Sequence, residues 1–401
     1  MVGRVRAAVA AAALGVLTSL GGAPPAPAGA GAPVCDTPPA PGQSRTDLPW
    51  AQRRLAPDRL APLADGTGVL VGVLDSGVDT RHPQLAGRVL RGMDFIARGN
   101  SGTLDCLGHG TGVASLIAAA PPPRGVAFRG LAPGARILPV RVSERIGEDS
   151  RGDTVDPAVL AEAIRWAVRQ RVDVLNLSFV LTRDEPPVRA AIAHAVSHDV
   201  VVVAAAGNFF DRNNPTPYPA AYPGVLGVGA IGPDGLRESR SQVGPYVDLV
   251  APGVEITVAA PGGGYAAQTG TSYAAPFVAA TAALLRQHRP ELSAAEVARR
   301  IVATADPSAG GRRTGEYGAG VVNPYRALTE EVARGAPEPV ATLPPTSVDP
   351  AVVAAQARAD LARRRAVGLA VAGGALAGLA LLVAVVLPRG VRRRWRPAGS
   401  G

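Results

Sequence analysis

Short apolar runs alternate with helical patterns through the middle of this chain, and this alternation restricts the fold more than any single residue does. An apolar run bounded by turn residues is typical of a strand buried inside a parallel sheet. Parallel strands need crossover connections, which place helices on both faces. We therefore predict an α/β fold built on a doubly wound parallel sheet. The predicted strands are 69–74, 137–142, 172–178, 200–206, 225–231 and 246–250, and the predicted helical stretches are 113–117, 157–169, 187–197, 272–288 and 293–304.

Four polar residues stand where these predicted elements begin or end. Asp75 and Asn208 follow strands, whereas His109 and Ser272 open helical stretches. Open α/β sheets bind their ligands at the carboxyl ends of the strands. A helix N-terminus also favours negative charge on whatever Ser272 attacks. We therefore expect all four residues to be functional, with Ser272 a candidate nucleophile, His109 a candidate base and Asn208 a candidate oxyanion donor.

Each of these signals has a plainer interpretation when it is taken alone. The Gly-Thr-Ser turn before residue 273 is compatible with a capped core helix, and Gly207-Asn208 with an ordinary turn. Asp75 is compatible with a simple turn residue. Asp75-Ser76-Gly77 also resembles the catalytic loop of aspartic proteases, but that class needs a second such loop, and the sequence contains none.

Taken together and in order, the four blocks resemble the signatures of the subtilisin family of serine proteases. The resemblance covers roughly residues 66 to 330, and within the family the chain is most similar to the mycosins, the membrane-anchored proteases of actinobacterial type VII secretion systems. The four blocks are Val73-Leu74-Asp75-Ser76-Gly77-Val78, Gly108-His109-Gly110-Thr111, Ala205-Ala206-Gly207-Asn208 and Gly270-Thr271-Ser272; the mycosin-like segments are 50–52, 222–230, 244–253 and 318–324.

The resemblance implies a subtilisin-like fold and a role for each site residue. Asp75, His109 and Ser272 correspond to the catalytic triad, and Asn208 to the side-chain donor of the oxyanion hole. The residues expected to flank the substrate residue before the cut are Ser178, Phe179, Val180, Ala205, Ala206 and Gly207. Val180 departs from the family pattern, because many subtilisins have glycine there, and we expect it to narrow or reshape the primary specificity pocket.

The chain has two cysteines, Cys35 and Cys106, and two cysteines in an exported protein more often pair than stay free. A bridge between them would stabilise the fold by about 4 kcal/mol on a chain-entropy estimate. Mycosins often have further cysteines in the protease domain. Because this chain has only one pair, a second disulfide cannot be carried over from them. Asp79 and Asp105 are expected to be structural, and because few carboxylates have calcium-loop spacing, neither a metal nor another cofactor is predicted.

Composition predicts six segments. Residues 1–30 have the layout of a secretory signal peptide, and residues 31–65 form a Pro-rich N-terminal extension. This extension is too short for the usual folded inhibitory propeptide, so we expect it to be retained and to wrap the domain. The protease domain is 66–330. A Pro-rich linker and juxtamembrane segment, 331–365, precedes an uncharged stretch, 366–387, long enough to be a single transmembrane helix.

Charge placement indicates which partners the chain has. The formal net charge is +9, but arginines that flank the two apolar segments account for it, including those of the tail 388–401. The basicity therefore fits a membrane and argues against nucleic acid. We expect a single-pass protein of the cell membrane, with its protease domain extracytoplasmic and its Arg-rich tail cytoplasmic.

Three functions remain open at this point. The first is an active endopeptidase with a protein or peptide substrate. The second is a structural component of a type VII secretion membrane complex that acts independently of cleavage. The third is an inactive relative, which the complete set of triad residues argues against.

Overall fold

The computed structural model describes residues 35, 40–99, 101–121, 128–143, 156–308, 313–332 and 365. It divides the chain into two units, Met1–Val332 and Ala333–Gly401, and every strand and multi-residue helix described here belongs to the first unit. The predicted signal peptide, transmembrane helix, cytoplasmic tail and most of the linker lie outside the described residues. Within the described residues, no helix has both the length and the apolar character needed to span a membrane.

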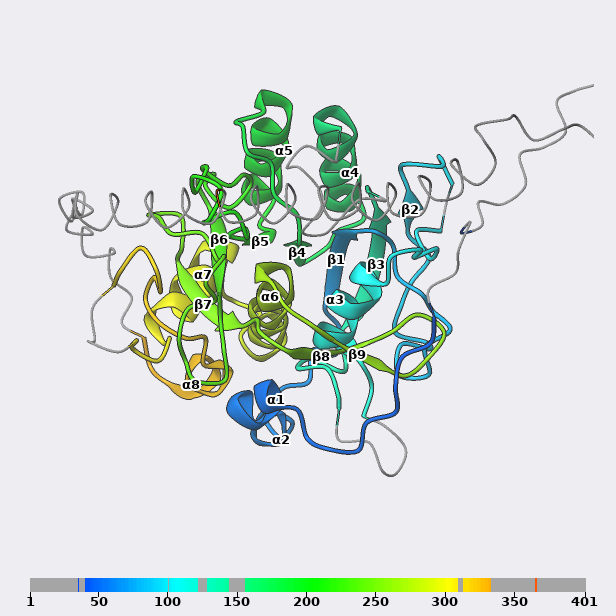
Figure 1. Ribbon diagram of the computed structural model, residues 1–401, viewed down its shortest axis with the longest axis horizontal. Coiled ribbons are helices and arrows are strands. Elements are labelled where there is room, and N and C mark those ends of the chain that lie inside the picture. The colour runs from blue at the N-terminus through cyan, green and yellow to red at the C-terminus, as the bar shows by residue number, and fades with distance from the viewer. Residues whose placement is uncertain are drawn as a thin grey trace, which may run out of the picture. The chain divides into compact units, whose positions relative to one another are not determined.

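A seven-stranded sheet forms the centre of the first unit (Figure 1). Every neighbouring pair is parallel, which confirms the predicted doubly wound sheet. The strand order is β2-β3-β1-β4-β5-β6-β7, so the strand order reverses at β1, the kind of point where α/β sheets carry their sites. The strands are β1 (Leu70–Asp75), β2 (Met93–Asp94), β3 (Arg136–Arg141), β4 (Val174–Leu177), β5 (Val201–Ala205), β6 (Val225–Ile231) and β7 (Leu249–Pro252).

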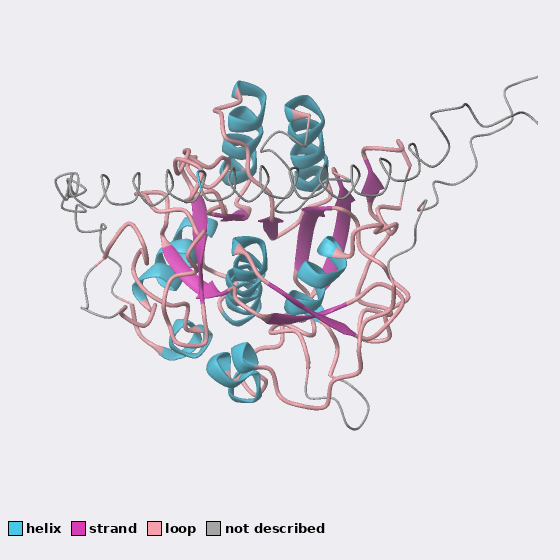
Figure 2. Ribbon diagram, in the orientation of Figure 1, coloured by secondary structure: helices cyan, strands magenta, loops and turns pink. Residues whose placement is uncertain are grey.

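Helices cover both faces of this sheet (Figure 2). On one face lie α4 (Pro157–Arg169) and α5 (Pro186–Ser197), and on the other α3 (His109–Ala118), α6 (Thr271–His288) and α7 (Ala294–Ala303). Along β5, Val201 and Val203 join the core under α6, whereas Val202 and Ala204 join the core under α4 and α5. Because both faces are buried, the strands are continuous apolar runs without polar alternation.

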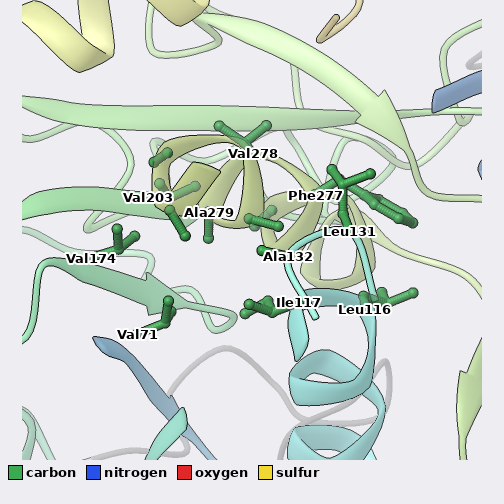
Figure 3. Close-up of a cluster of buried hydrophobic side chains, with 14 of the residues drawn as sticks. Val71, Leu116, Ile117, Leu131, Ala132, Val174, Val203, Phe277, Val278 and Ala279 are labelled. Atoms are coloured by element: carbon green, nitrogen blue, oxygen red, sulfur yellow. The ribbon is translucent and has the colours of Figure 1, made fainter. Parts of the chain in front are cut away.

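The helix α6 passes through the core of one layer, and its residues from Thr271 to Leu285 are all buried. Figure 3 shows Phe277, Val278 and Ala279 of this helix near Val203 of β5 and Leu116 of α3. Many of its other residues are alanine, which lets neighbouring elements approach closely. The first turn of α6 is therefore surrounded by other parts of the core.

One predicted strand begins later than expected. The sequence predicted 246–250, but β7 begins at Leu249, because a turn occupies the preceding residues and Val247 N–H donates to the Gly244 carbonyl at 3.1 Å. Sequence patterns also missed short elements, which are held by contacts with distant segments. They are β2, the antiparallel pair β8 (Ile256–Ala259) and β9 (Tyr265–Gln268), and the helices α1 (Trp50–Leu55), α2 (Pro57–Leu60) and α8 (Pro324–Thr329).

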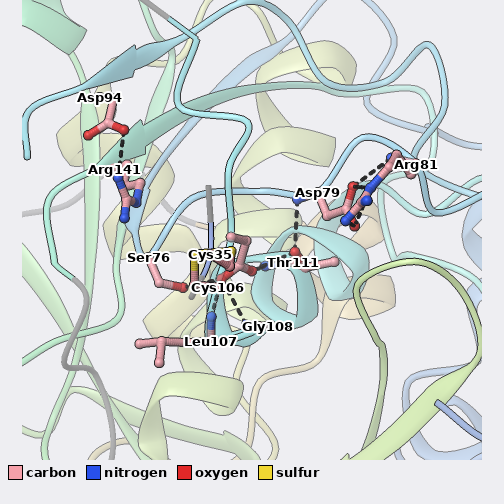
Figure 4. Close-up of a disulfide and its surroundings, with 11 residues drawn as sticks. Cys35, Ser76, Asp79, Arg81, Asp94, Cys106, Leu107, Gly108, Thr111 and Arg141 are labelled. Carbon is pink, nitrogen blue, oxygen red and sulfur yellow. Dashed lines mark hydrogen bonds and ion pairs between the residues drawn. A yellow bond between two sulfur atoms is a disulfide. The ribbon is translucent and has the colours of Figure 1, made fainter. Parts of the chain in front are cut away.

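The N-terminal extension is attached to the protease unit at several described places. A disulfide joins Cys35 to Cys106, as expected, with Cα atoms 5.4 Å apart (Figure 4). Gln43 pairs with Tyr265 of β9, and the indole of Trp50 donates to the Val254 carbonyl at 2.9 Å. These contacts agree with an extension that follows the surface of the domain. Its retention in the mature protein stays a prediction.

We expect Phe277→Ala to lower the free energy of unfolding by about 3 to 5 kcal/mol, because it empties a core site that is 2 % exposed. Chemical denaturation monitored by circular dichroism measures this change. Leu236→Ala is the control, since Leu236 is 60 % exposed and its loss should change stability by no more than about 0.5 kcal/mol. Equal effects of the two substitutions would contradict the packing described for α6.

Candidate active site

The carboxylate of Asp75 lies next to the ring of His109 at the carboxyl end of β1. Asp75 is the last residue of β1 and is fully buried, and His109 is the first residue of α3. The Nδ1 of His109 lies 2.7 Å from Oδ1 of Asp75, which also accepts the Ser76 N–H at 2.7 Å. A carboxylate can only accept, so Nδ1 carries the proton and Nε2 is left as an acceptor.

The second ring nitrogen of His109 faces the hydroxyl of Ser272. The Nε2–Oγ distance is 3.0 Å, within reach for proton transfer. Ser272 is the second residue of α6, where backbone N–H groups have no partner within the helix. Both side chains are largely buried, with His109 8 % and Ser272 9 % exposed. One hydrogen-bonded chain therefore joins a carboxylate, an imidazole and a hydroxyl from three separate elements.

Two opposing effects act on the pKa of His109. Burial lowers it, because it disfavours the charged ring. The charge and hydrogen bond of Asp75 raise it, and the charge of Asp105 adds to them. The carboxylates prevail, so the pKa of His109 lies above its ordinary value. The site therefore stabilises an imidazolium, which is the state the ring reaches after it accepts a proton.

Asn208 lies beside the first turn of α6. Its Oδ1 accepts the Thr271 N–H at 2.9 Å, which orients the amide. A Cβ built on Gly270 would lie 3.1 Å from the Nδ2 of Asn208 and 3.5 Å from the Oγ of Ser272. The donor end of the amide therefore faces the same small space as the serine hydroxyl. Gly270 has φ +147° and no side chain, and both properties keep this space open.

The segment at the end of β4 contacts the backbone of Ser272. Ser178 donates its hydroxyl to the Ser272 carbonyl at 3.0 Å and accepts from the amide of Asn176 at 2.8 Å. Thr271 Oγ1 accepts the Gly207 N–H at 3.0 Å. Neither Asn176 nor Thr271 was predicted to have a role of its own. The available signal for Asn176 was an asparagine inside an otherwise apolar predicted strand, and the structure shows this asparagine fully buried.

The other residues predicted to contact substrate lie at the carboxyl ends of β4 and β5. The side chains of Phe179, Ala205 and Ala206 are buried. Val180 is half-buried, and its Cγ2 lies 3.3 Å from a Cβ built on Gly207. The two segments thus lie side by side next to Ser272. Their contact with a substrate, and the effect of Val180 on specificity, stay predictions.

Asp79 and Asp105, predicted to be structural, both accept several hydrogen bonds. Asp79 pairs with Arg81 at 2.8 Å and accepts the Gly262 N–H at 2.8 Å. Asp105 accepts from residues around the start of α3. Among the residues that the structure describes, there is no group of three or more histidine, cysteine, aspartate or glutamate side chains placed to hold a metal ion.

A serine, a histidine and an aspartate in this order of contact, at the carboxyl ends of a parallel sheet, define the class of α/β serine hydrolases. The chain order Asp, His, Ser is the order found in subtilisin. The model of the subtilase family, peptidase S8, matches residues 66–320, and the chain belongs to this family. It is a subtilisin-like serine peptidase.

Three comparisons connect the chain to the mycosins in particular. It is 35 % identical to Mycosin-1 of Mycobacterium tuberculosis over 362 residues, covering 77 % of this chain and 80 % of that protein. The crystal structure of MycP1 from the ESX-1 type VII secretion system superposes with a TM-score of 0.65 at 31 % identity, covering 77 % of this chain and 93 % of that one. A chain of an intact ESX-5 inner membrane complex superposes with a TM-score of 0.64 at 31 % identity. The match covers 84 % of this chain and 92 % of that one.

We expect Gly270→Ala to lower turnover about tenfold to a hundredfold, since small displacements within a reacting geometry have effects of this size. The new methyl group would press on Asn208 and force an unfavourable φ beside Ser272. Hydrolysis of a chromogenic peptide measures the change. Gly68→Ala is the matched control, because Gly68 also has positive φ, at +87°, but no atom lies within 4 Å of its Cβ position. Full activity in Gly270→Ala would contradict the inference that the space between Asn208 and Ser272 must stay free of a side chain.

The raised pKa of His109 predicts the acid side of the pH profile. The ring acts as a base only when it is neutral, so kcat/KM should fall as the pH drops through the His109 pKa. Because that pKa is raised, the midpoint should lie above about pH 6.5, the ordinary value for histidine. A pH profile of kcat/KM with an uncharged peptide measures this midpoint. A midpoint below the ordinary value would refute the dominance of the carboxylates.

Proposed function

We propose that this protein is a membrane-anchored, extracytoplasmic serine endopeptidase of the mycosin type, associated with type VII secretion. The observation that carries the proposal is the continuous hydrogen-bonded chain from Asp75 through His109 to Ser272. In this proposal the three residues are the catalytic triad, and Asn208 is the side-chain donor of the oxyanion hole. The substrate is a protein or peptide.

The geometry supports a definite role for each group in acyl transfer. Ser272 Oγ attacks the peptide carbonyl while Nε2 of His109 takes its proton at the 3.0 Å contact. Asp75 holds the ring in the required tautomer and stabilises the imidazolium. His109 then returns the proton to the leaving amine. A water molecule, deprotonated by the same ring, hydrolyses the acyl-enzyme.

The negative charge on the tetrahedral intermediate needs donors that are already in place. Ser272 N–H at the start of α6 supplies one, and Nδ2 of Asn208 supplies the other. Asn208 is held by the Thr271 N–H, so its amide does not have to reorient during the reaction. Donors that are fixed beforehand stabilise the transition state without a reorganisation cost.

Sequence and similarity support the proposed location. The apolar stretches near the two ends of the sequence fit an export signal and an anchor. The similar chain from the ESX-5 inner membrane complex belongs to a membrane assembly of a type VII system. We infer that the protease domain faces away from the cytoplasm and that the Arg-rich tail remains inside.

Labelling of isolated membranes with a fluorophosphonate probe tests the nucleophile directly. The wild-type protein should be labelled, because the probe reacts with an activated serine, whereas Ser272→Ala should not be labelled at equal abundance. Ser178→Ala is a useful comparison, since it removes another buried hydroxyl near the site and should retain labelling at a reduced rate. Labelling that persists in Ser272→Ala would assign the nucleophile elsewhere.

Asn208→Ala should lower kcat about a hundredfold to a thousandfold with little change in KM, which is the effect of removing one oxyanion donor in subtilisin. Steady-state hydrolysis of a peptide ester and a peptide amide measures the change. Because Asn208 also caps the Thr271 N–H, Asn208→Asp serves as control: it keeps an acceptor for that bond but loses the donor. Normal turnover in both variants would remove Asn208 from the mechanism.

A second candidate function is a structural role in the secretion complex that does not require cleavage. The observation favouring it is the similarity to a chain within an intact ESX-5 inner membrane complex. The two functions are compatible in one protein. Secretion by a deletion strain carrying Ser272→Ala distinguishes their importance: restored secretion would make the structural role sufficient, and failure at normal abundance would make catalysis necessary.

A further inference from the structure

Asp105 accepts five hydrogen bonds at the start of α3. Its Oδ1 accepts from the Ser76 hydroxyl at 2.8 Å, from Gly108 N–H at 2.8 Å and from Leu107 N–H at 3.1 Å. Its Oδ2 accepts from Thr111 N–H at 2.8 Å and Thr111 Oγ1 at 2.5 Å. All five partners donate, so the arrangement suits the ionised form.

These bonds converge on the first turn of α3, where His109 is the first residue. Gly108 and Thr111 lie on either side of His109, and Asp105 binds the backbone of both. Gly108 is left-handed, with φ +78°, and offers no capping side chain of its own. The side chain of Asp105 therefore caps the N-terminus of α3, although Asp105 lies outside the helix. These bonds set the position of the His109 backbone.

A second connection runs from Asp105 to Asp75. The Ser76 hydroxyl donates to Asp105 and accepts the Gly110 N–H at 3.0 Å, and it lies 3.2 Å from Oδ1 of Asp75. A Cβ on Gly110 would lie 3.0 Å from the Asp75 Cβ and 2.1 Å from the Gly77 carbonyl oxygen. The first turn of α3 is thus packed directly on the end of β1, with Ser76 joining the two carboxylates.

The backbone next to Asp105 is also anchored. Cys106 forms the disulfide with Cys35, and Figure 4 shows this bridge beside Ser76, Leu107 and Gly108. Thr111, in the first turn of α3, uses its hydroxyl to accept the Asp79 N–H at 2.9 Å while donating to Asp105. Asp105 is therefore held at its own backbone and at both carboxylate oxygens.

We propose that Asp105 is a positioning residue for the reaction: through Ser76, Gly108 and Thr111 it fixes the His109 ring against Asp75, and its charge favours the imidazolium. This inference rests on the proposed function of the triad. Asp105 is buried, at 3 % exposed, so in this proposal it acts only through His109. A purely structural cap would hold α3 without affecting the protonation of the ring.

The charge balance of the site supports this role. Burial raises the pKa of the Asp105 carboxyl, and the charge of Asp75 acts in the same direction, against the hydrogen bonds from Thr111 and Ser76. The charge of Asp105 in turn contributes to the raised pKa of His109. Two buried carboxylates near one imidazole favour its charged form more than one carboxylate does.

The test uses Asp105→Asn in the full-length protein, because asparagine keeps the size and an acceptor oxygen but removes the charge. We expect kcat for a peptide substrate to fall about tenfold to a hundredfold with KM nearly unchanged. The acid midpoint of kcat/KM should shift to lower pH, since a negative charge near His109 is lost. Ser76→Ala, which leaves the bonds to Gly108 and Thr111 intact, should lower kcat by a smaller factor.

Asp248→Asn is the matched control. Asp248 is a half-buried carboxylate whose pKa is also raised by burial, and it accepts from Gly227 N–H and from Arg313, away from the triad. Its loss should lower the melting temperature without moving the acid midpoint. If Asp105→Asn behaves in the same way, with unchanged kcat and midpoint, Asp105 is only a structural cap and the proposal fails.

A measurement without catalysis separates this proposal from that of the protease activity. The protein has five histidines, and ¹³C-labelling of their rings lets NMR titrate His109, assigned with His109→Gln. A lower His109 pKa in Asp105→Asn supports the electrostatic role even if no substrate is cleaved. An unchanged pKa overturns it even if the wild-type enzyme is active. A wild-type protein that is inactive and not labelled by fluorophosphonate would contradict the proposed protease function, but it would not contradict the electrostatic role of Asp105.

Discussion

The whole site depends on one constraint, which is that two helices begin at neighbouring carboxyl ends of one parallel sheet: α3 beside the end of β1, and α6 beside the ends of β4 and β5. The strand β1 lies between β3 and β4, so Asp75 at its end is fully enclosed. The helix α3 brings His109 to this point from one segment, and α6 brings Ser272 from another 163 residues further along the chain. Without a rigid parallel sheet, no hydrogen-bonded chain would join them.

Placing charges at such a point has an energetic cost, and the surrounding hydrogen bonds offset it. A buried carboxylate is tolerated only when it is well paired. Asp75 accepts from the Ser76 N–H and His109, and Asp105 accepts from five donors. These bonds also restrict movement, so the same contacts that keep the charges buried hold the imidazole in its working orientation.

Much of this protein could be predicted from its sequence, for local reasons. The apolar runs located six of the seven sheet strands, and the pattern of helix 157–169 was confirmed at both ends as α4. The strand β2 and the pair β8 and β9 could not be predicted, because they are short and depend on partners far along the chain. The start of β7 was placed three residues too early, since the turn before it contains Tyr246 and Val247, which favour strands.

The sequence alone determined the fold class and the four candidate residues, because strand periodicity and glycine-rich turns are local properties of the chain. The tertiary structure alone decided that His109 lies 2.7 Å from Asp75 and 3.0 Å from Ser272, and that Asp105, Ser76 and Ser178 support them. Distances between segments depend on how the sheet twists and how the helices pack. Those are properties of the whole core, and no single segment encodes them.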